Sequence, residues 1–92
     1  MAKFLMLGKY SVQGVQGIAA ERTKKVVDII QKSGGKVNAM YALLGCHDAA
    51  LVVDFPGNTD AMKASIAITK LTAIGFTTYP ALPIEEFDKI LG

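Results

Sequence analysis

The sequence is poor in the residues that form covalent cross-links or hold metal ions. Its 92 residues include one cysteine, one histidine and no tryptophan. A lone cysteine cannot form a disulfide within the chain, so nothing indicates an oxidising compartment. The triplet Cys46-His47-Asp48 has no second histidine or cysteine to complete a metal shell. We therefore expect no metal and no cofactor.

Long apolar runs and clusters of one charge are also missing. The apolar stretch Phe4–Leu7 is too short for a signal peptide, and no run reaches the length of a membrane span. The net charge is +2, and the only adjacent basic residues, Lys24 and Lys25, fall on the polar side of an expected helix. We expect a cytoplasmic protein that binds neither membranes nor nucleic acid.

What the sequence does contain is typical of one globular domain covering residues 1–92. About half of the residues are apolar and a fifth are charged. The apolar periodicity predicts the order βαββαβ followed by a short helix. Strands are expected at residues 4–10, 37–44, 49–55 and 76–79, and helices at residues 13–33, 58–72 and 84–91. Gly34-Gly35 should end the first helix, Gly75 the second, and Pro80 the last strand.

This order predicts a ferredoxin-like α+β fold. The second and third strands are separated by four residues, so they should form an antiparallel hairpin. Right-handed crossovers then place both main helices on one face of a four-stranded antiparallel sheet, with the first and third strands in its centre.

The other face of that sheet is expected to be apolar and uncovered. Ala50 and Val52 share one side of the third strand, and simple alternation gives each side of the second strand an apolar set. A bare patch of about 500–700 Å² exceeds what soluble monomers usually expose. Covering it is worth on the order of 10 kcal/mol per protomer. The last helix, with Ile84, Phe87 and Ile90, is expected to cover about one strand. We therefore predict a homodimer or higher oligomer formed through the sheet face.

The chain from about Phe4 to Asp88 resembles the GYD family, small proteins named for a Gly-x-Tyr-Asp signature. The matching segments are Lys9-Tyr10, Glu21-Arg22-Thr23, Tyr41-Ala42-Leu43-Leu44-Gly45, Asp48, Asp54-Phe55-Pro56, Lys70-Leu71-Thr72 and Phe76. The resemblance implies a dimeric α/β barrel in which two ferredoxin-like sheets face each other, and it implies no particular activity. His47 stands where the family has tyrosine, so the role of that phenol does not carry over.

Arg22 is the strongest candidate for a functional residue. On a helical wheel it falls in the apolar stripe between Ala19 and Val26, where a guanidinium requires a partner. A partner within the chain, either Asp48, Asp54 or a strand-end carbonyl, would make Arg22 structural, and so would a side chain that snorkels to water. A bound anion would make Arg22 functional, because the guanidinium fork binds two oxygens. We predict a partly exposed Arg22 at the mouth of a cleft, about 3 Å from Asp48 or Asp54. Tyr10, at the end of the first strand, completes the candidate ligand-binding set.

The triplet Cys46-His47-Asp48 has two interpretations. In the first it is a hairpin turn, with Gly45 in a left-handed conformation and Asp48 accepting hydrogen bonds from turn amides. In the second it supplies an acid–base group, and His47, the only imidazole, is then the weak catalytic candidate.

Three classes of function stay open at this point. The first is a binding or regulatory module for a small anionic metabolite. The second is a cofactor-independent enzyme of isomerase or monooxygenase type. The third is a structural assembly subunit, in which Met62 and Ile66, which lie off the main stripe of their helix, make further contacts.

Overall fold

A computed structural model describes all residues from Met1 to Gly92. Its elements follow the predicted order, with one additional helix near the start. They are β1 (Ala2–Tyr10), α1 (Val12–Gln16), α2 (Ala20–Lys32), β2 (Lys36–Ala42), β3 (Ala49–Phe55), α3 (Asn58–Thr72), β4 (Ile74–Ala81) and α4 (Ile84–Leu91).

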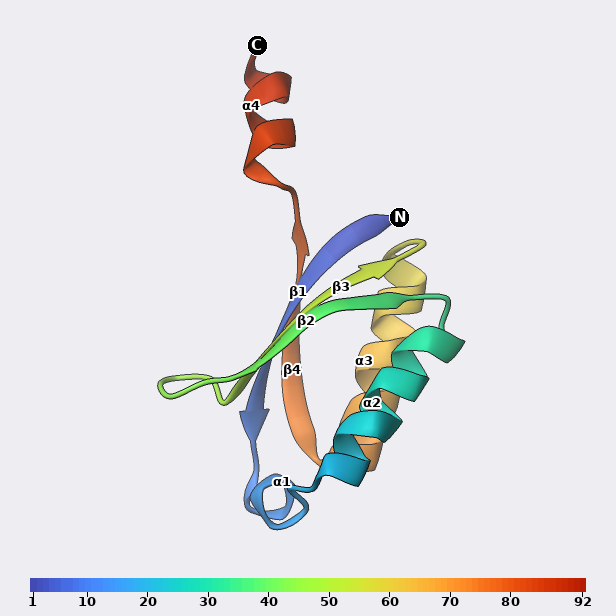
Figure 1. The fold of residues 1–92 in the computed structure, drawn as a ribbon, viewed down its shortest axis with the longest axis vertical. Helices are drawn as coiled ribbons and strands as arrows, with labels where there is room; N and C mark the ends of the chain where they lie inside the picture. The colour runs from blue at the N-terminus through green and yellow to red at the C-terminus, as the bar shows by residue number, and fades with distance from the viewer.

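The sheet has the order β2-β3-β1-β4 and is antiparallel throughout. Both central strands were predicted correctly, and α2 and α3 lie together on one face of the sheet (Figure 1). The ferredoxin-like α+β fold is therefore confirmed. None of the helices is both long and apolar enough to span a membrane.

The core lies between this face of the sheet and the two long helices. Two small residues of α3, Ala61 and Ala64, are buried against the sheet. Their small side chains let the helix approach the strands closely. Phe4 and Phe55 meet edge to face, with ring centroids 5.9 Å apart. The ten residues of the core cluster are Phe4, Met6, Val26, Ile30, Leu51, Val53, Phe55, Ala61, Ala64 and Ile68.

The helix expected over residues 13–33 is divided near its start, where Gly14 and Gly17 predicted a late or irregular beginning. The chain forms α1 and α2, separated at Gly17–Ala19. Gly14 and Gly17 weaken helix propagation there, and Gly14 is buried where a Cβ would lie 3.4 Å from the Ala73 carbonyl oxygen. Val15 and Ile18 are therefore exposed instead of joining the core.

The second strand differs because of a β-bulge. The register of β2 against β3 shifts between Val37 and Ala39, which leaves Asn38 as the extra residue. Val37 and Met40 then pack against the core, while Ala39 and Tyr41 are paired with residues of the opposite face. The strand also ends at Ala42, two residues earlier than predicted.

The end of α3 and the start of β4 were also misplaced. Ala73, with φ of 59°, ends the helix in the left-handed region, and Gly75 lies inside the strand. β4 continues through Pro80 to Ala81. A proline is tolerated there because β4 is an edge strand, whose outer side needs no hydrogen-bond partner.

The face of the sheet opposite the helices carries the predicted apolar residues. Pairing places Leu5 beside Val52 and Leu7 beside Ala50, with Tyr79 next to Leu5 on the outer strand. We call this surface the open face, and its members are Leu5, Leu7, Ala39, Tyr41, Ala50, Val52, Thr77 and Tyr79. No element of the chain lies over it in Figure 1.

The last helix does not cover any strand, contrary to expectation. α4 has the predicted bounds, but it continues the line of β4 away from the body of the protein (Figure 1). None of its residues is buried. The molecule is consequently elongated, with principal extents of 48 × 29 × 18 Å.

Candidate functional site

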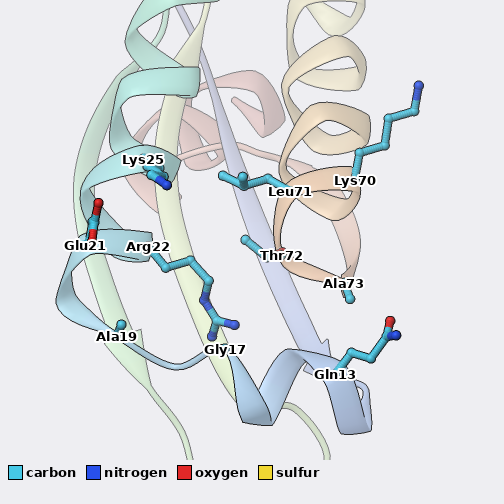
Figure 2. Close-up of a pocket in the computed structure, with 10 residues that line it drawn as sticks. All are labelled: Gln13, Gly17, Ala19, Glu21, Arg22, Lys25, Lys70, Leu71, Thr72 and Ala73. Carbon is cyan, nitrogen blue, oxygen red and sulfur yellow. The ribbon is translucent and has the colours of Figure 1, made fainter.

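The Arg22 side chain lies in a cleft between the start of α2 and the C-terminal end of α3. The cleft has a volume of about 470 Å³. Figure 2 shows its ten lining residues: Gln13, Gly17, Ala19, Glu21, Arg22, Lys25, Lys70, Leu71, Thr72 and Ala73. We call this site the Arg22 cleft.

Ser11 joins α1 to the end of α3 beside the Arg22 cleft. Its hydroxyl donates a hydrogen bond to the Ala73 carbonyl oxygen at 2.7 Å and accepts one from the Gly14 amide at 2.9 Å. The residue therefore caps α1 and joins it to the end of α3, which are far apart in the sequence. The bond to Ala73 also satisfies one of the carbonyl groups that a helix end leaves without a partner.

Arg22 is half-buried on the same face of α2 as Val26 and Ile30, so the predicted helical phase is confirmed. Its Nη1 donates to the Gly14 carbonyl oxygen at 2.5 Å, and the guanidinium carbon lies 5.7 Å from the centre of the Tyr10 ring. In Figure 2 the side chain extends from α2 toward Gly17. One carbonyl and one aromatic face leave several guanidinium N–H groups free for another acceptor.

The predicted contact of Arg22 with an acidic side chain is wrong. The two ion pairs of the chain join Lys3 to Asp54 and Lys32 to Asp28, and neither includes Arg22. The partner is a carbonyl, as one of the alternatives held, but it belongs to α1 and not to a strand end. The charge of Arg22 is thus not neutralised within the chain.

Basic side chains outnumber acidic ones around the Arg22 cleft. Lys25 and Lys70 line it together with Arg22, against the single carboxylate of Glu21. Ala19 precedes the first residue of α2 and has no side-chain oxygen. The backbone amides at the N-terminus of α2, which carry partial positive charge, therefore have no side-chain cap. Lys70 is exposed and its side chain extends away from Arg22 in Figure 2, so Arg22 is the charge held inside the cleft and the lysines flank it. This arrangement favours an anion.

Tyr10 and Asp48 lie next to each other, and Asp48 acts through the backbone. Its carboxylate accepts a hydrogen bond from the Tyr10 amide at 2.8 Å. Its own amide donates to Gly8, and its carbonyl accepts from Leu43, both at 2.8 Å. Asp48 therefore fastens the end of β1, where Tyr10 lies, to the hairpin. Tyr10 therefore contacts both Arg22 and Asp48, but neither Tyr10 nor Asp48 lines the Arg22 cleft.

Asp54 lies at the other end of β3, away from the Arg22 cleft. It pairs with Lys3 at 3.0 Å across the β1–β3 ladder. Hydrogen bonding by the Asn38 side chain and then by Lys3 holds the pKa of Asp54 below its ordinary value. The structure thus separates Asp54 from the other three candidate ligand-binding residues.

Cys46 and His47 lie in the connection between β2 and β3. Cys46 is exposed, and its carbonyl oxygen accepts a hydrogen bond from Lys9 Nζ at 3.1 Å. His47 is half-buried and is not among the residues that line the Arg22 cleft. Gly45 has φ of 155°, in the region that favours glycine. Gly45 and the exposed Cys46 agree with the turn interpretation, but the Asp48 carboxylate accepts its hydrogen bond from the Tyr10 amide of β1 and not from turn amides.

Sequence reasoning missed Lys25 and Lys70 as neighbours of Arg22. Lys25 follows Arg22 by three residues, so helical spacing was a signal for it. Lys70 comes from α3 and reaches the site only through tertiary packing.

The fold and the site define a small ferredoxin-like α+β domain with a basic cleft at one end of its helical layer. The sequence model of the GYD domain family matches residues 4–91, essentially the whole chain. The chain belongs to the GYD domain family. A search of curated proteins finds no match.

Proposed function

We propose that the protein is a binding module for a small anionic metabolite, which Arg22 holds in the Arg22 cleft. The observation that carries this proposal is the half-buried guanidinium without a carboxylate partner. Burial of a permanent charge is costly unless a counter-charge compensates for it. A carboxylate or phosphate would supply that charge and accept two parallel N–H groups from the fork.

The cleft suits a ligand of a few carbon atoms. Its volume of about 470 Å³ lies at the lower end of ordinary small-molecule sites. Gln13 and Lys25 add polar groups to its lining, and Leu71 adds an apolar one. No comparable observation favours the enzymatic alternative, because His47 does not line this cleft.

The proposal is tested with two anions, inorganic phosphate and citrate, in a thermal-shift titration at constant ionic strength. Both anions stabilise many proteins through exclusion from their surface, so a matched variant is needed. Lys24→Met removes an exposed basic residue of the same helix that does not line the cleft. Specific binding raises the free energy of unfolding by about 2.7 kcal/mol at a hundred times Kd.

We expect Arg22→Met to abolish the anion-dependent part of the shift and Lys24→Met to retain it. Without anion, Arg22→Met should destabilise by no more than about 2 kcal/mol, because it removes one hydrogen bond and one cation–π contact but strands no carboxylate. Equal anion responses in both variants would refute the binding role of Arg22. A loss of several kcal/mol without anion would instead make Arg22 structural.

We further propose that the module works as a homodimer through the open face. Leu5, Leu7 and Val52 lie in the middle of this surface, and Tyr41 is 60% exposed at its side. Apolar patches of this kind on soluble proteins mark interaction sites. Pairing two such faces would bury each against its own counterpart, which is the geometry of a twofold interface.

The dimer is tested by sedimentation or light scattering at micromolar concentration. Val52→Asp places a charge in the centre of the open face and should yield monomer or aggregate. Gln31→Glu adds the same charge at an exposed position of α2 and should remain dimeric. A wild-type protein that stays folded at 9.8 kDa, or a fully dimeric Val52→Asp, would contradict this interface.

A further inference from the structure

The C-terminal helix α4 is amphipathic and leaves its apolar side in solvent. Phe87 is 46% exposed, Ile90 71% and Leu91 73%. With Ile84 these residues cover about a third of the helix circumference, and the carboxylates occupy the other side. A helix of eight residues is marginal in water without packing. The apolar side of α4 therefore needs a surface to pack on.

The connection to β4 directs α4 away from its own domain. Ala81 and Leu82 stand between Pro80 and Pro83, and no glycine occurs there. A residue before proline is restricted to extended conformations, which applies to both Tyr79 and Leu82. Pro83 itself has φ of −53° and ψ of 142°, which is also extended. The chain thus continues straight from β4 into α4 instead of turning back (Figure 1).

A matching surface exists elsewhere on the molecule, between α3 and the edge strand β4. This groove has a volume of about 400 Å³, and apolar residues make up more than half of its lining. Met62 and Ile66 form one wall and are 65% and 52% exposed, and Phe76 lies on the strand side. A hydrogen bond of 3.0 Å between Ser65 and Thr78 ties the two walls together. We call it the α3–β4 groove.

The charges of the two surfaces are complementary. α4 carries Glu85, Glu86 and Asp88 against Lys89, a net charge of −2, so the rest of the chain carries +4. Lys63 and Lys70 flank the apolar wall of α3 and are exposed. Charge complementarity of this kind steers partners together and opposes contacts between like charges.

We propose that α4 docks in the α3–β4 groove of a second copy, and that the two copies exchange their helices reciprocally. A helix about 12 Å long covers only part of the roughly 800 Å² that each partner of a stable interface contributes. Reciprocal exchange doubles the buried area, since each copy then gives one helix and one groove. The groove lies on the helical side of the sheet, so pairing through the open face leaves it free.

Site-specific cross-linking tests the exchange directly. In a Cys46→Ser background, which removes the exposed native thiol, one preparation carries Ile66→Cys and a second, differently tagged one carries Phe87→Cys. The two are mixed, allowed to exchange and oxidised. We expect a covalent heterodimer of the two tags. Glu86→Cys replaces Phe87→Cys in the control; it lies on the polar side of α4 and should give at least a tenfold lower yield.

A single chain with both Ile66→Cys and Phe87→Cys completes the test. If it closes into a cross-linked monomer while the mixture gives no heterodimer, α4 folds onto its own groove and the exchange is refuted. Absence of any cross-link in both experiments also refutes docking in this groove. All altered positions are exposed, and thermal unfolding with a conserved midpoint confirms that each variant folds. The readout does not involve the open face, so it stands independently of pairing there.

Discussion

Ala73 is the chain's only non-glycine residue with a positive φ, and it lies on the rim of the Arg22 cleft. Its φ of 59° and ψ of 23° end α3 in the left-handed conformation. For a residue with a side chain this conformation costs about 1–2 kcal/mol, whereas glycine adopts it freely. Glycine also loses about 0.5–1 kcal/mol more backbone entropy on folding. We therefore expect Ala73→Gly to stabilise the protein by about 0.5–1 kcal/mol.

The assay is thermal unfolding at one fixed protein concentration, because the stability of an oligomer depends on concentration. For a domain of this size, 1 kcal/mol corresponds to a shift of about 4–8 °C in Tm. Ala67→Gly is the control, since it makes the same substitution inside α3 and should cost about 1 kcal/mol. An Ala73→Gly variant that is destabilised as much as Ala67→Gly would show that Ala73 is not strained. The reasoning about this helix end would then be wrong.

Two further predictions concern the opposite end of the sheet. A Cβ at Gly35 would lie 2.7 Å from the Phe55 ring and 2.8 Å from the Asp54 carbonyl oxygen. Gly35→Ala should therefore destabilise the fold by about 2–3 kcal/mol, measured by urea titration. An unchanged urea midpoint would contradict this packing. The pKa of Asp54 is lower in the folded state than in the unfolded state, where it is about 3.8. The ionised carboxylate therefore adds stability at pH values above 3.8, and this contribution is lost as the pH falls through the lower folded pKa. Asp54→Asn should therefore reduce stability at pH 7 and make the loss of stability below pH 4 less steep. A variant whose stability depends on pH in the same way as that of the wild type would refute the role of Lys3 and Asn38.

The strands and their order could be predicted from the sequence because apolar alternation is a local signal. The bulge at Asn38 could not, since one extra residue in β2 is fixed by its pairing with β3. Simple alternation placed Val37 and Ala39 on the same side, and the bulge puts them on opposite sides. The break at Gly17 had a sequence signal in the two glycines, but the burial of Gly14 against Ala73 depends on tertiary contact.

The candidate site was predictable only in part. Helical spacing predicted that Arg22 lies on the same side of its helix as the core residue Val26, because burial follows the phase of the helix. The identity of its partners did not follow, since Gly14 is brought near by the turn between α1 and α2 and Tyr10 by the end of β1. The surface on which α4 packs could likewise not be predicted from the sequence. An amphipathic pattern indicates that one side of a helix packs, but it does not indicate against which surface.

The central position of β1 has a consequence for the order in which the protein folds. β1 is the first strand of the chain to be synthesised, yet both of its partners come much later. Lys3 pairs with Asp54, 51 residues away, and its partner on the other side, Ala81, belongs to the last strand. At roughly 5–20 residues per second, β1 stays unpaired for several seconds during synthesis. The sheet cannot close until β4 has emerged, so folding should be slow for a chain of this size. Substitutions that delay the pairing of β1 should then appear in cells as aggregation, even where they leave the equilibrium stability unchanged.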